Sequence, residues 1–115
     1  MKKLNQKICE EFSKGNFEFV FPYFTNDVEW NFVGTSVTKG KEAVIAHCNK
    51  MMVEMDNSTL NNTDEIVGYN IIAVQGYCDY TNEGKSGKVE YCDVYKFAGD
   101  KLQEITSYFI DTKKE

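Results

Sequence analysis

The sequence contains no arginine, a single proline, a single histidine and no long apolar run. All 13 of its basic residues are lysines, and 18 acidic residues outnumber them to give a net charge of −5 at pH 7. Arginine is the usual bidentate partner of phosphate and carboxylate groups. An acidic chain without arginine is therefore poorly suited to nucleic acid or to a phosphate clamp, and we expect no nucleic-acid partner.

No apolar segment approaches the length of a membrane span, and no apolar stretch follows the basic start as in a signal peptide. We therefore expect no membrane contact and a cytoplasmic location. The four cysteines should then be reduced, and because none forms a C-x-x-C pair we expect packing residues, no metal site and no cofactor. Cys78 and Cys92 are equally distant from Lys85, which suggests cross-strand neighbours in a hairpin.

What the chain does contain is enough apolar material for one core. Its 115 residues are 42% hydrophobic and 14% aromatic. A folded domain of 13.2 kDa buries about two thirds of the surface that its unfolded chain exposes, so neither disulfides nor a metal is needed for stability. We expect a single domain spanning residues 1–115.

The hydrophobic pattern changes from helix-like to strand-like along the chain. Leu4, Ile8 and Phe12 form one apolar stripe of a helix, and a second short helix should follow and stop near Pro22. A strand is expected at 28–33, a loop at 34–40 and a helix at 41–55. Four further strands, joined by turns, are expected at 59–66, 71–80, 88–97 and 103–111.

This order of elements predicts an α+β fold. Strands joined by short turns are antiparallel neighbours, and the helices precede most of them. A strongly curved, mostly antiparallel sheet wrapped around the N-terminal helices would form a conical, half-open barrel.

Three segments make the chain similar to the nuclear transport factor 2-like superfamily, in its SnoaL-like branch of polyketide cyclases and ketosteroid isomerase relatives. They are residues 24–34 with Trp30 and Gly34, residues 40–44 with the pattern G-K-E-A-V, and residues 92–102 with the pattern C-D-V-Y-K-F and then G-D-K-L. The resemblance implies a ligand pocket at the open end of the cone. It also implies a homodimer formed through the outer face of the sheet.

Only some of the catalytic residues of each group of relatives have a counterpart in this sequence. Asp93 matches the acid with which ketosteroid isomerases hydrogen-bond an oxyanion, but Asn31 stands where their base would be and Ile8 where their tyrosine would be. Compared with limonene epoxide hydrolases, Asn31 and Asp93 are kept, whereas Tyr91 replaces an arginine and Ser107 replaces the second aspartate. The SnoaL-like cyclases, which need little beyond one acid in the pocket, remain open.

Strand alternation places Tyr91 and Asp93 on one face of their strand. Asp93 is either a structural hydrogen-bonding group or a pocket acid whose pKa desolvation raises; a neutral carboxyl could donate to a ligand carbonyl. His47 could shuttle protons or simply be a structural residue of its helix. Trp30 could belong to the core or stack on a ligand, while Glu29 and Asn31, on the opposite face, are expected to point into the cone.

We thus expect a pocket for a small, mostly apolar, carbonyl-bearing ligand, with cofactor-free acid–base chemistry if the protein is an enzyme. The alternative is a dimeric scaffold or a non-catalytic binding module with a vestigial pocket. The expected catalytic residues are Asp93 and His47, and the expected ligand-binding residues are Asn31, Trp30, Tyr91 and Ser107.

Overall fold

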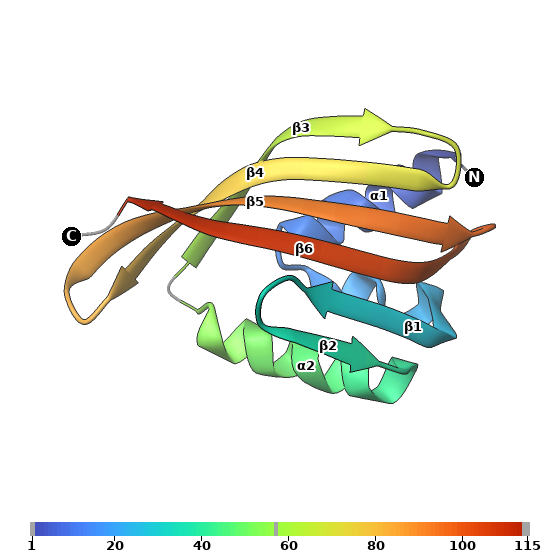
Figure 1. Cartoon of the computed structure of the whole chain (residues 1–115), viewed down its shortest axis with the longest axis horizontal. Helices are drawn as coiled ribbons and strands as arrows, with labels where there is room; N and C mark the ends of the chain where they lie inside the picture. The colour runs from blue at the N-terminus through green and yellow to red at the C-terminus, as the bar shows by residue number, and fades with distance from the viewer. Residues whose placement is uncertain (1, 57, 114–115) are drawn as a thin grey trace.

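The computed structural model describes residues 2–56 and 58–113 (Figure 1). Its elements are α1 (Lys2–Ser13), η1 (Phe17–Phe19), η2 (Phe21–Tyr23), β1 (Phe24–Phe32), β2 (Ser36–Lys39), α2 (Lys41–Glu54), β3 (Ser58–Val67), β4 (Ile71–Asn82), β5 (Lys85–Ala98) and β6 (Lys101–Lys113).

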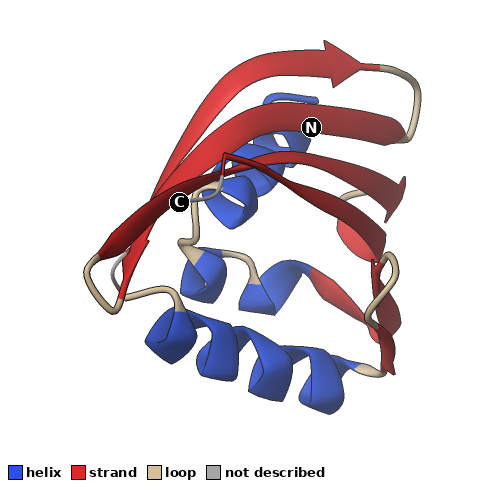
Figure 2. Cartoon of the chain, turned by 60° about the vertical axis from the view of Figure 1, so that its left-hand side comes forward, coloured by secondary structure: helices blue, strands red, loops and turns tan. Residues whose placement is uncertain are grey.

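The strands form one sheet in the order β2-β1-β6-β5-β4-β3. All neighbouring pairs are antiparallel except β1 with β6, which is parallel. The sheet curves, and the helices lie within its concave side (Figure 2). The predicted α+β cone with a mostly antiparallel sheet is therefore confirmed. Among the described residues, no helix is long and apolar enough to span a membrane.

Two local predictions differ from the structure. The expected loop at 34–40 contains strand β2, whose side chains are almost all exposed, so it lacks the alternating apolar pattern that signals a strand. The expected second helix is instead two single turns of 3₁₀ helix, with Pro22 in the first turn of η2. Proline has no backbone N–H and so cannot continue the hydrogen bonding of η1 into a longer helix.

The β4–β5 hairpin turns at Glu83 and Gly84, which have φ angles of 53° and 80°. Positive φ at both central residues is typical of the tight two-residue turns whose twist matches that of paired strands. This turn pairs Cys78 with Val89 and Cys92 with Gln75. The expectation that the two cysteines are cross-strand neighbours is therefore wrong: Cys78 is buried, and Cys92 lies on the opposite face of the sheet.

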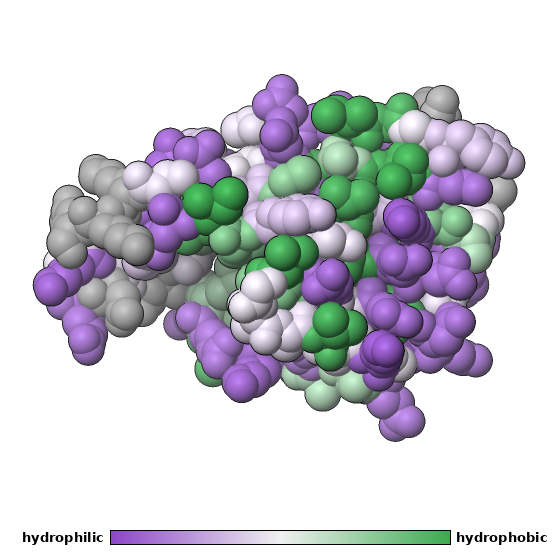
Figure 3. Space-filling view, in the orientation of Figure 1, coloured by the Kyte–Doolittle hydropathy of each residue, from purple (hydrophilic) through white to green (hydrophobic). Residues whose placement is uncertain are grey.

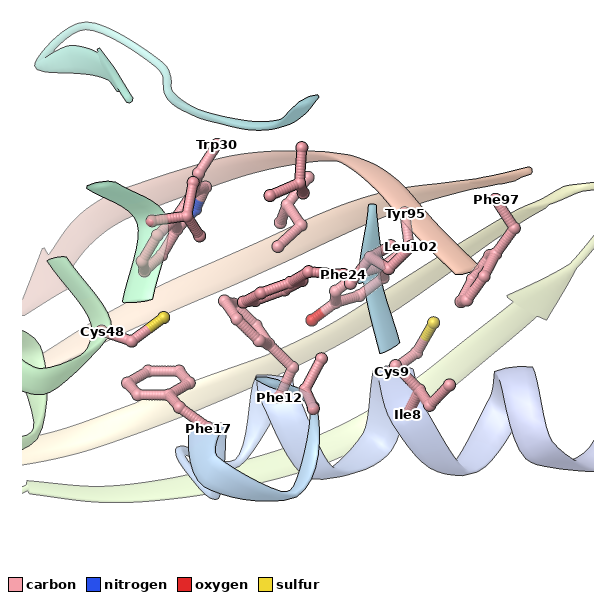
Figure 4. Close-up of a cluster of buried hydrophobic side chains, with 14 of the residues drawn as sticks. Ile8, Cys9, Phe12, Phe17, Phe24, Trp30, Cys48, Tyr95, Phe97 and Leu102 are labelled. Atoms are coloured by element: carbon pink, nitrogen blue, oxygen red, sulfur yellow. The ribbon is translucent and has the colours of Figure 1, made fainter. Parts of the chain in front are cut away.

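The core lies between the helices and the concave face of the sheet (Figure 4). Phe12 of α1 is at its centre, with ring centroids 4.7 Å from Phe17, 5.1 Å from Trp30 and 5.9 Å from Tyr95. The helix α1 ends because Gly15 adopts a φ of 92°, a conformation that side-chain-bearing residues rarely take. This ending leaves Ser13, the last helical residue, buried against the sheet.

Gly76 of β4 is a position where any side chain would collide with its surroundings. A Cβ atom there would lie 2.2 Å from the backbone oxygen of Asn61 and 2.5 Å from the hydroxyl of Tyr91. We expect Gly76→Ala to destabilise the protein by about 1–3 kcal/mol in urea unfolding, because the strand backbone must move. Gly87→Ala is the matched control: the nearest atoms to its Cβ belong to the half-exposed side chain of Tyr80 and not to backbone. Equal losses for the two variants would contradict this explanation.

Candidate functional site

The buried carboxyl of Asp93 lies at the centre of a polar cluster inside the cone. Asp93 is only 3% exposed. Its Oδ2 atom accepts a hydrogen bond of 2.8 Å from the Ser13 hydroxyl, and its Oδ1 atom accepts one of 2.6 Å from the Ser107 hydroxyl. The hydroxyl of Tyr95 in turn contacts that of Ser13, and the Trp30 Nε1 atom donates to the Ser107 hydroxyl at 2.9 Å.

Four elements bring these side chains together. Asp93 and Ser107 are directly opposite each other in the antiparallel pair β5–β6, and Tyr95 is two residues from Asp93 on the same face. Trp30 comes from β1, the parallel neighbour of β6. Ser13 approaches from the end of α1, on the other side of the cone.

Burial raises the pKa of Asp93 from its ordinary value to about 6, while the nearby hydroxyl groups of Ser107, Ser13 and Tyr95 act in the lowering direction. In the described part of the chain, the recorded ion pairs join lysines to Glu11 and Glu54 and do not involve Asp93. The raised pKa expected for an Asp93 without a cationic partner therefore agrees with the structure. A pKa of about 6 leaves this carboxyl mostly ionised at pH 7.

The cone interior beside Asp93 is nearly full. The cavity there has a volume of about 10 Å³, roughly the space that one water molecule requires. Apart from Asp93 and Ser13 its walls are apolar and aromatic, and the lining residues are Phe12, Ser13, Phe17, Trp30, Met51, Met55, Leu60, Asp93 and Phe109. The structure thus has a buried acid facing a small, mostly apolar space.

Larger hollows lie on the outside of the molecule. One of about 460 Å³ runs between α1 and β3, and includes Glu10 and Glu65. Burial, with the neighbouring Glu10 as a further cause, raises the pKa of Glu65 to about 7. Another of about 510 Å³ lies at the β3–β4 turn, between Asn5 and Phe97. Both are open depressions that do not contain the Asp93 cluster.

The predicted site residues fall into three groups. Asp93, Trp30 and Ser107 are brought together as described above. Tyr91 is buried on the same face, but its hydroxyl donates to Asn62 Oδ1 at 2.6 Å and its ring stacks on Phe109. It does not line the cavity beside Asp93.

Asn31 and His47 lie elsewhere. The expectation that Glu29 and Asn31 point into the cone is wrong: both are exposed on the outer face, because the bulky Trp30 between them takes the inward position. His47 joins the site only indirectly. Its ring lies 4.6 Å from that of Trp30, and its Nδ1 atom is 3.1 Å from the Thr38 hydroxyl. Burial and the nearby Lys50 lower the pKa of His47.

Sequence reasoning missed two members of the cluster. Tyr95 was detectable, since it shares the inward face of β5 with Asp93. Ser13 carried no signal, because a serine at the end of a helix is ordinarily exposed and only the helix position brings it to Asp93.

A family model and solved structures both match this chain. The family model of the SnoaL-like domain matches residues 6–105. An NTF2-like protein of unknown function from Cytophaga hutchinsonii is 42% identical, with a TM-score of 0.92 over 96% of this chain and 99% of that one.

Two more distant structures share the fold. An NTF2-like protein from Anabaena variabilis is 16% identical, with a TM-score of 0.80 over 97% of this chain and 90% of that one. An epoxide hydrolase from M. tuberculosis is 13% identical, with a TM-score of 0.73 over 94% of this chain and 84% of that one. A search of curated proteins found no match.

Proposed function

The chain belongs to the SnoaL-like domain family, and on this premise we propose that the interior of its cone binds a small, mostly apolar molecule with Asp93 as polar anchor. The observation that carries the proposal is a buried carboxyl, without a cationic partner among the described residues, that faces a mostly apolar cavity. Apolar cavities with a few convergent polar groups are the usual form of small-molecule sites.

A ligand larger than water requires the cavity to open. Met51 and Met55 from the end of α2, and Leu60 from β3, form one side of the lining and are only half-buried. Methionine side chains are unbranched and adapt readily to a changed neighbour. We therefore place the entrance at these three side chains, which can move without disturbing the strands that hold Asp93.

Asp93 also supports acid–base chemistry on such a ligand. A group acts best as a general base or acid when its pKa is close to the working pH, and the pKa of Asp93 is raised to about 6. The SnoaL-like branch, in which one pocket acid suffices for the cyclases, fits this single carboxyl better than the isomerases or epoxide hydrolases, which need further residues that this chain lacks.

An NMR screen of small aromatic alcohols, amines and ketones tests the proposal, with the Trp30 indole N–H signal reporting on the cone interior. We expect Asp93→Leu to weaken the best hit by roughly tenfold or more while the protein stays folded, because the ligand's polar group loses its hydrogen bond. Asn31→Leu, on the outer face, is the control and should leave affinity unchanged. Equal affinity in Asp93→Leu and the parent would rule out the anchor.

One observation favours the alternative of a non-catalytic scaffold with a vestigial pocket. The cavity has room for about one water, and both oxygens of Asp93 already accept hydrogen bonds from the protein. If the protein is such a scaffold, no compound in the screen will shift the Trp30 indole N–H signal at any concentration up to the millimolar range.

We also propose that the partner of the chain is a second copy, bound through the outer face of the sheet. Figure 3 shows apolar side chains gathered over this face. Paired residues form a nearly uncharged row across all six strands, namely Ile66, Ala73, Val94, Thr106, Asn31 and Val37. Ile66 is 64% exposed and Val37 is 54% exposed in the isolated chain. Pairing of two such faces would remove this apolar surface from water.

Val94, near the middle of that row, is the residue to change. We expect the parent to be a dimer in light scattering at micromolar concentration, and Val94→Glu to be a monomer with an unchanged circular dichroism spectrum, because two like charges would face each other across the interface. Val53→Glu, a similar change at a 76% exposed site on α2, should remain dimeric. A monomeric parent would overturn the dimer proposal.

A further inference from the structure

We propose that Asp93 acts as an acceptor, so that the cone interior selects molecules whose polar group donates a hydrogen bond, a hydroxyl or an ammonium, over carbonyl compounds and carboxylates. We further propose that Trp30 is the positioning residue that keeps Asp93 an acceptor. The inference rests on the proposed binding function and changes its ligand class, since the sequence alone suggested a carbonyl compound.

The hydrogen bond from Trp30 has only one possible direction. An indole N–H can donate but cannot accept. It donates to the Ser107 oxygen at 2.9 Å, so the Ser107 hydrogen cannot point toward Trp30. The Oδ1 atom of Asp93, 2.6 Å from the Ser107 oxygen, accepts this hydrogen. Trp30 therefore orients Ser107 as a donor to Asp93.

The other carboxyl oxygen has a matching arrangement. Ser13 has one hydroxyl hydrogen, which it donates to Oδ2 of Asp93 at 2.8 Å. The contact between Ser13 and Tyr95 must then be made with the Tyr95 hydroxyl as donor. Both chains of hydrogen bonds consequently point toward Asp93, one starting at Trp30 and the other at Tyr95.

A proton on Asp93 would disturb these hydrogen bonds. A protonated carboxyl could donate to one of its present partners, Ser13 or Ser107, only if that serine turned its own hydrogen away from Asp93. Leaving a buried donor without an acceptor is costly. An ionised carboxylate avoids this, and its two oxygens keep unused lone pairs for a donor that enters the cavity.

The surroundings favour a donor that is neutral or positive. The described groups whose pKa values Asp93 influences are thiols and phenols, and their raised pKa values keep them uncharged at neutral pH, so they add no second charge beside Asp93: Cys9 of α1 and Tyr91, Cys92 and Tyr95 of β5. The cavity walls include the rings of Phe12, Phe17, Trp30 and Phe109. Aromatic faces attract cations, whereas a carboxylate ligand would meet the charge of Asp93 without compensation.

Four probes of similar size separate the possibilities: benzyl alcohol, benzylamine, benzaldehyde and benzoate. In NMR titrations at pH 7.5, we expect benzyl alcohol or benzylamine to bind at least tenfold more tightly than benzaldehyde, and benzoate to bind weakest. Lowering the pH to 5 should reduce that preference, because Asp93 becomes protonated. Benzaldehyde binding as tightly as benzyl alcohol would overturn the inference while leaving the binding function intact. If none of the four shifts the Trp30 signal, the binding function fails and the inference with it.

The role of Trp30 has a readout that needs no ligand, namely the pKa of Asp93 measured from its carboxyl ¹³C shift. Trp30→Phe removes the N–H that keeps the Ser107 hydrogen turned toward Asp93, so the hydrogen bond to the carboxylate weakens and this pKa should rise above the parent's. Phe32→Leu is the control, because Phe32 packs on Trp30, with 5.9 Å between ring centroids, but is not among the hydrogen-bond partners of Asp93. A shift of the same size in both variants, or none in Trp30→Phe, would show that Trp30 only fills space.

Discussion

Replacing Phe12 by alanine is expected to lower the free energy of unfolding by about 3–5 kcal/mol, the usual loss for a buried phenylalanine. Phe12 is 3% exposed and its ring meets four others, with centroids between 4.7 and 6.5 Å away. These rings come from η1, β1 and β5, so the side chain joins α1 to both halves of the sheet. Its removal leaves a space that none of the strands can close by moving alone.

Urea unfolding monitored by circular dichroism measures this loss, and Phe12→Leu, which keeps most of the volume, should lose clearly less. Because Phe12 also lines the cavity beside Asp93, Phe12→Ala should enlarge that cavity. Benzene should then stabilise the variant and not the parent, as happens when an apolar cavity of sufficient size is created. A loss below about 1 kcal/mol would mean that the core is not centred on this ring.

The second large effect concerns the pH dependence of stability. The pKa of Asp93 is about 6 in the folded protein against an ordinary 3.8. Below pH 3.8 both states hold the proton and the group has no effect. As the pH rises from there to 6, the unfolded chain is ionised while the folded protein keeps its proton, so stability falls. Above pH 6 the full penalty of about 3 kcal/mol is present.

Asp93→Asn removes this titration while keeping the shape of the side chain. We expect the stability of the variant relative to the parent to increase by about 2 kcal/mol between pH 4.5 and 7.5, which is the part of the penalty that falls in this window. Urea unfolding of both proteins across that range measures the difference, and all other groups cancel. A constant difference across the range would mean that Asp93 has an ordinary pKa.

The sequence allowed the sheet to be predicted well because each long strand faces the core with one side. Alternation placed Tyr91 and Asp93 on one face, and both are buried there in the structure. Strand β2 could not be found this way, since its side chains are almost all exposed and no apolar period exists. The register of β4 against β5 could not be predicted, because it depends on a two-residue turn at Glu83 and Gly84 that lies within a longer polar segment.

The site was only partly predictable, for reasons that differ between residues. Asp93 and Ser107 were predicted from the resemblance to the superfamily, which matches both to site positions of its members. For Asn31, the resemblance to epoxide hydrolases outweighed the simpler physical argument that Trp30, the largest apolar side chain in the strand, must be the one inside. Ser13 could not be found, because its place depends on where the end of α1 packs against the sheet, which no local pattern encodes.

The central claim is that Asp93 is a buried carboxylate held by two converging hydrogen-bond chains inside the cone. The carboxyl ¹³C shift of Asp93, followed by NMR from pH 4 to pH 9 in the ligand-free protein, tests it most directly. We predict a single titration with a pKa near 6, well above the ordinary 3.8. A midpoint near 4 would mean a solvated carboxyl, and one above 8 would mean a neutral acid at pH 7, which acts as a donor; either result would contradict the account.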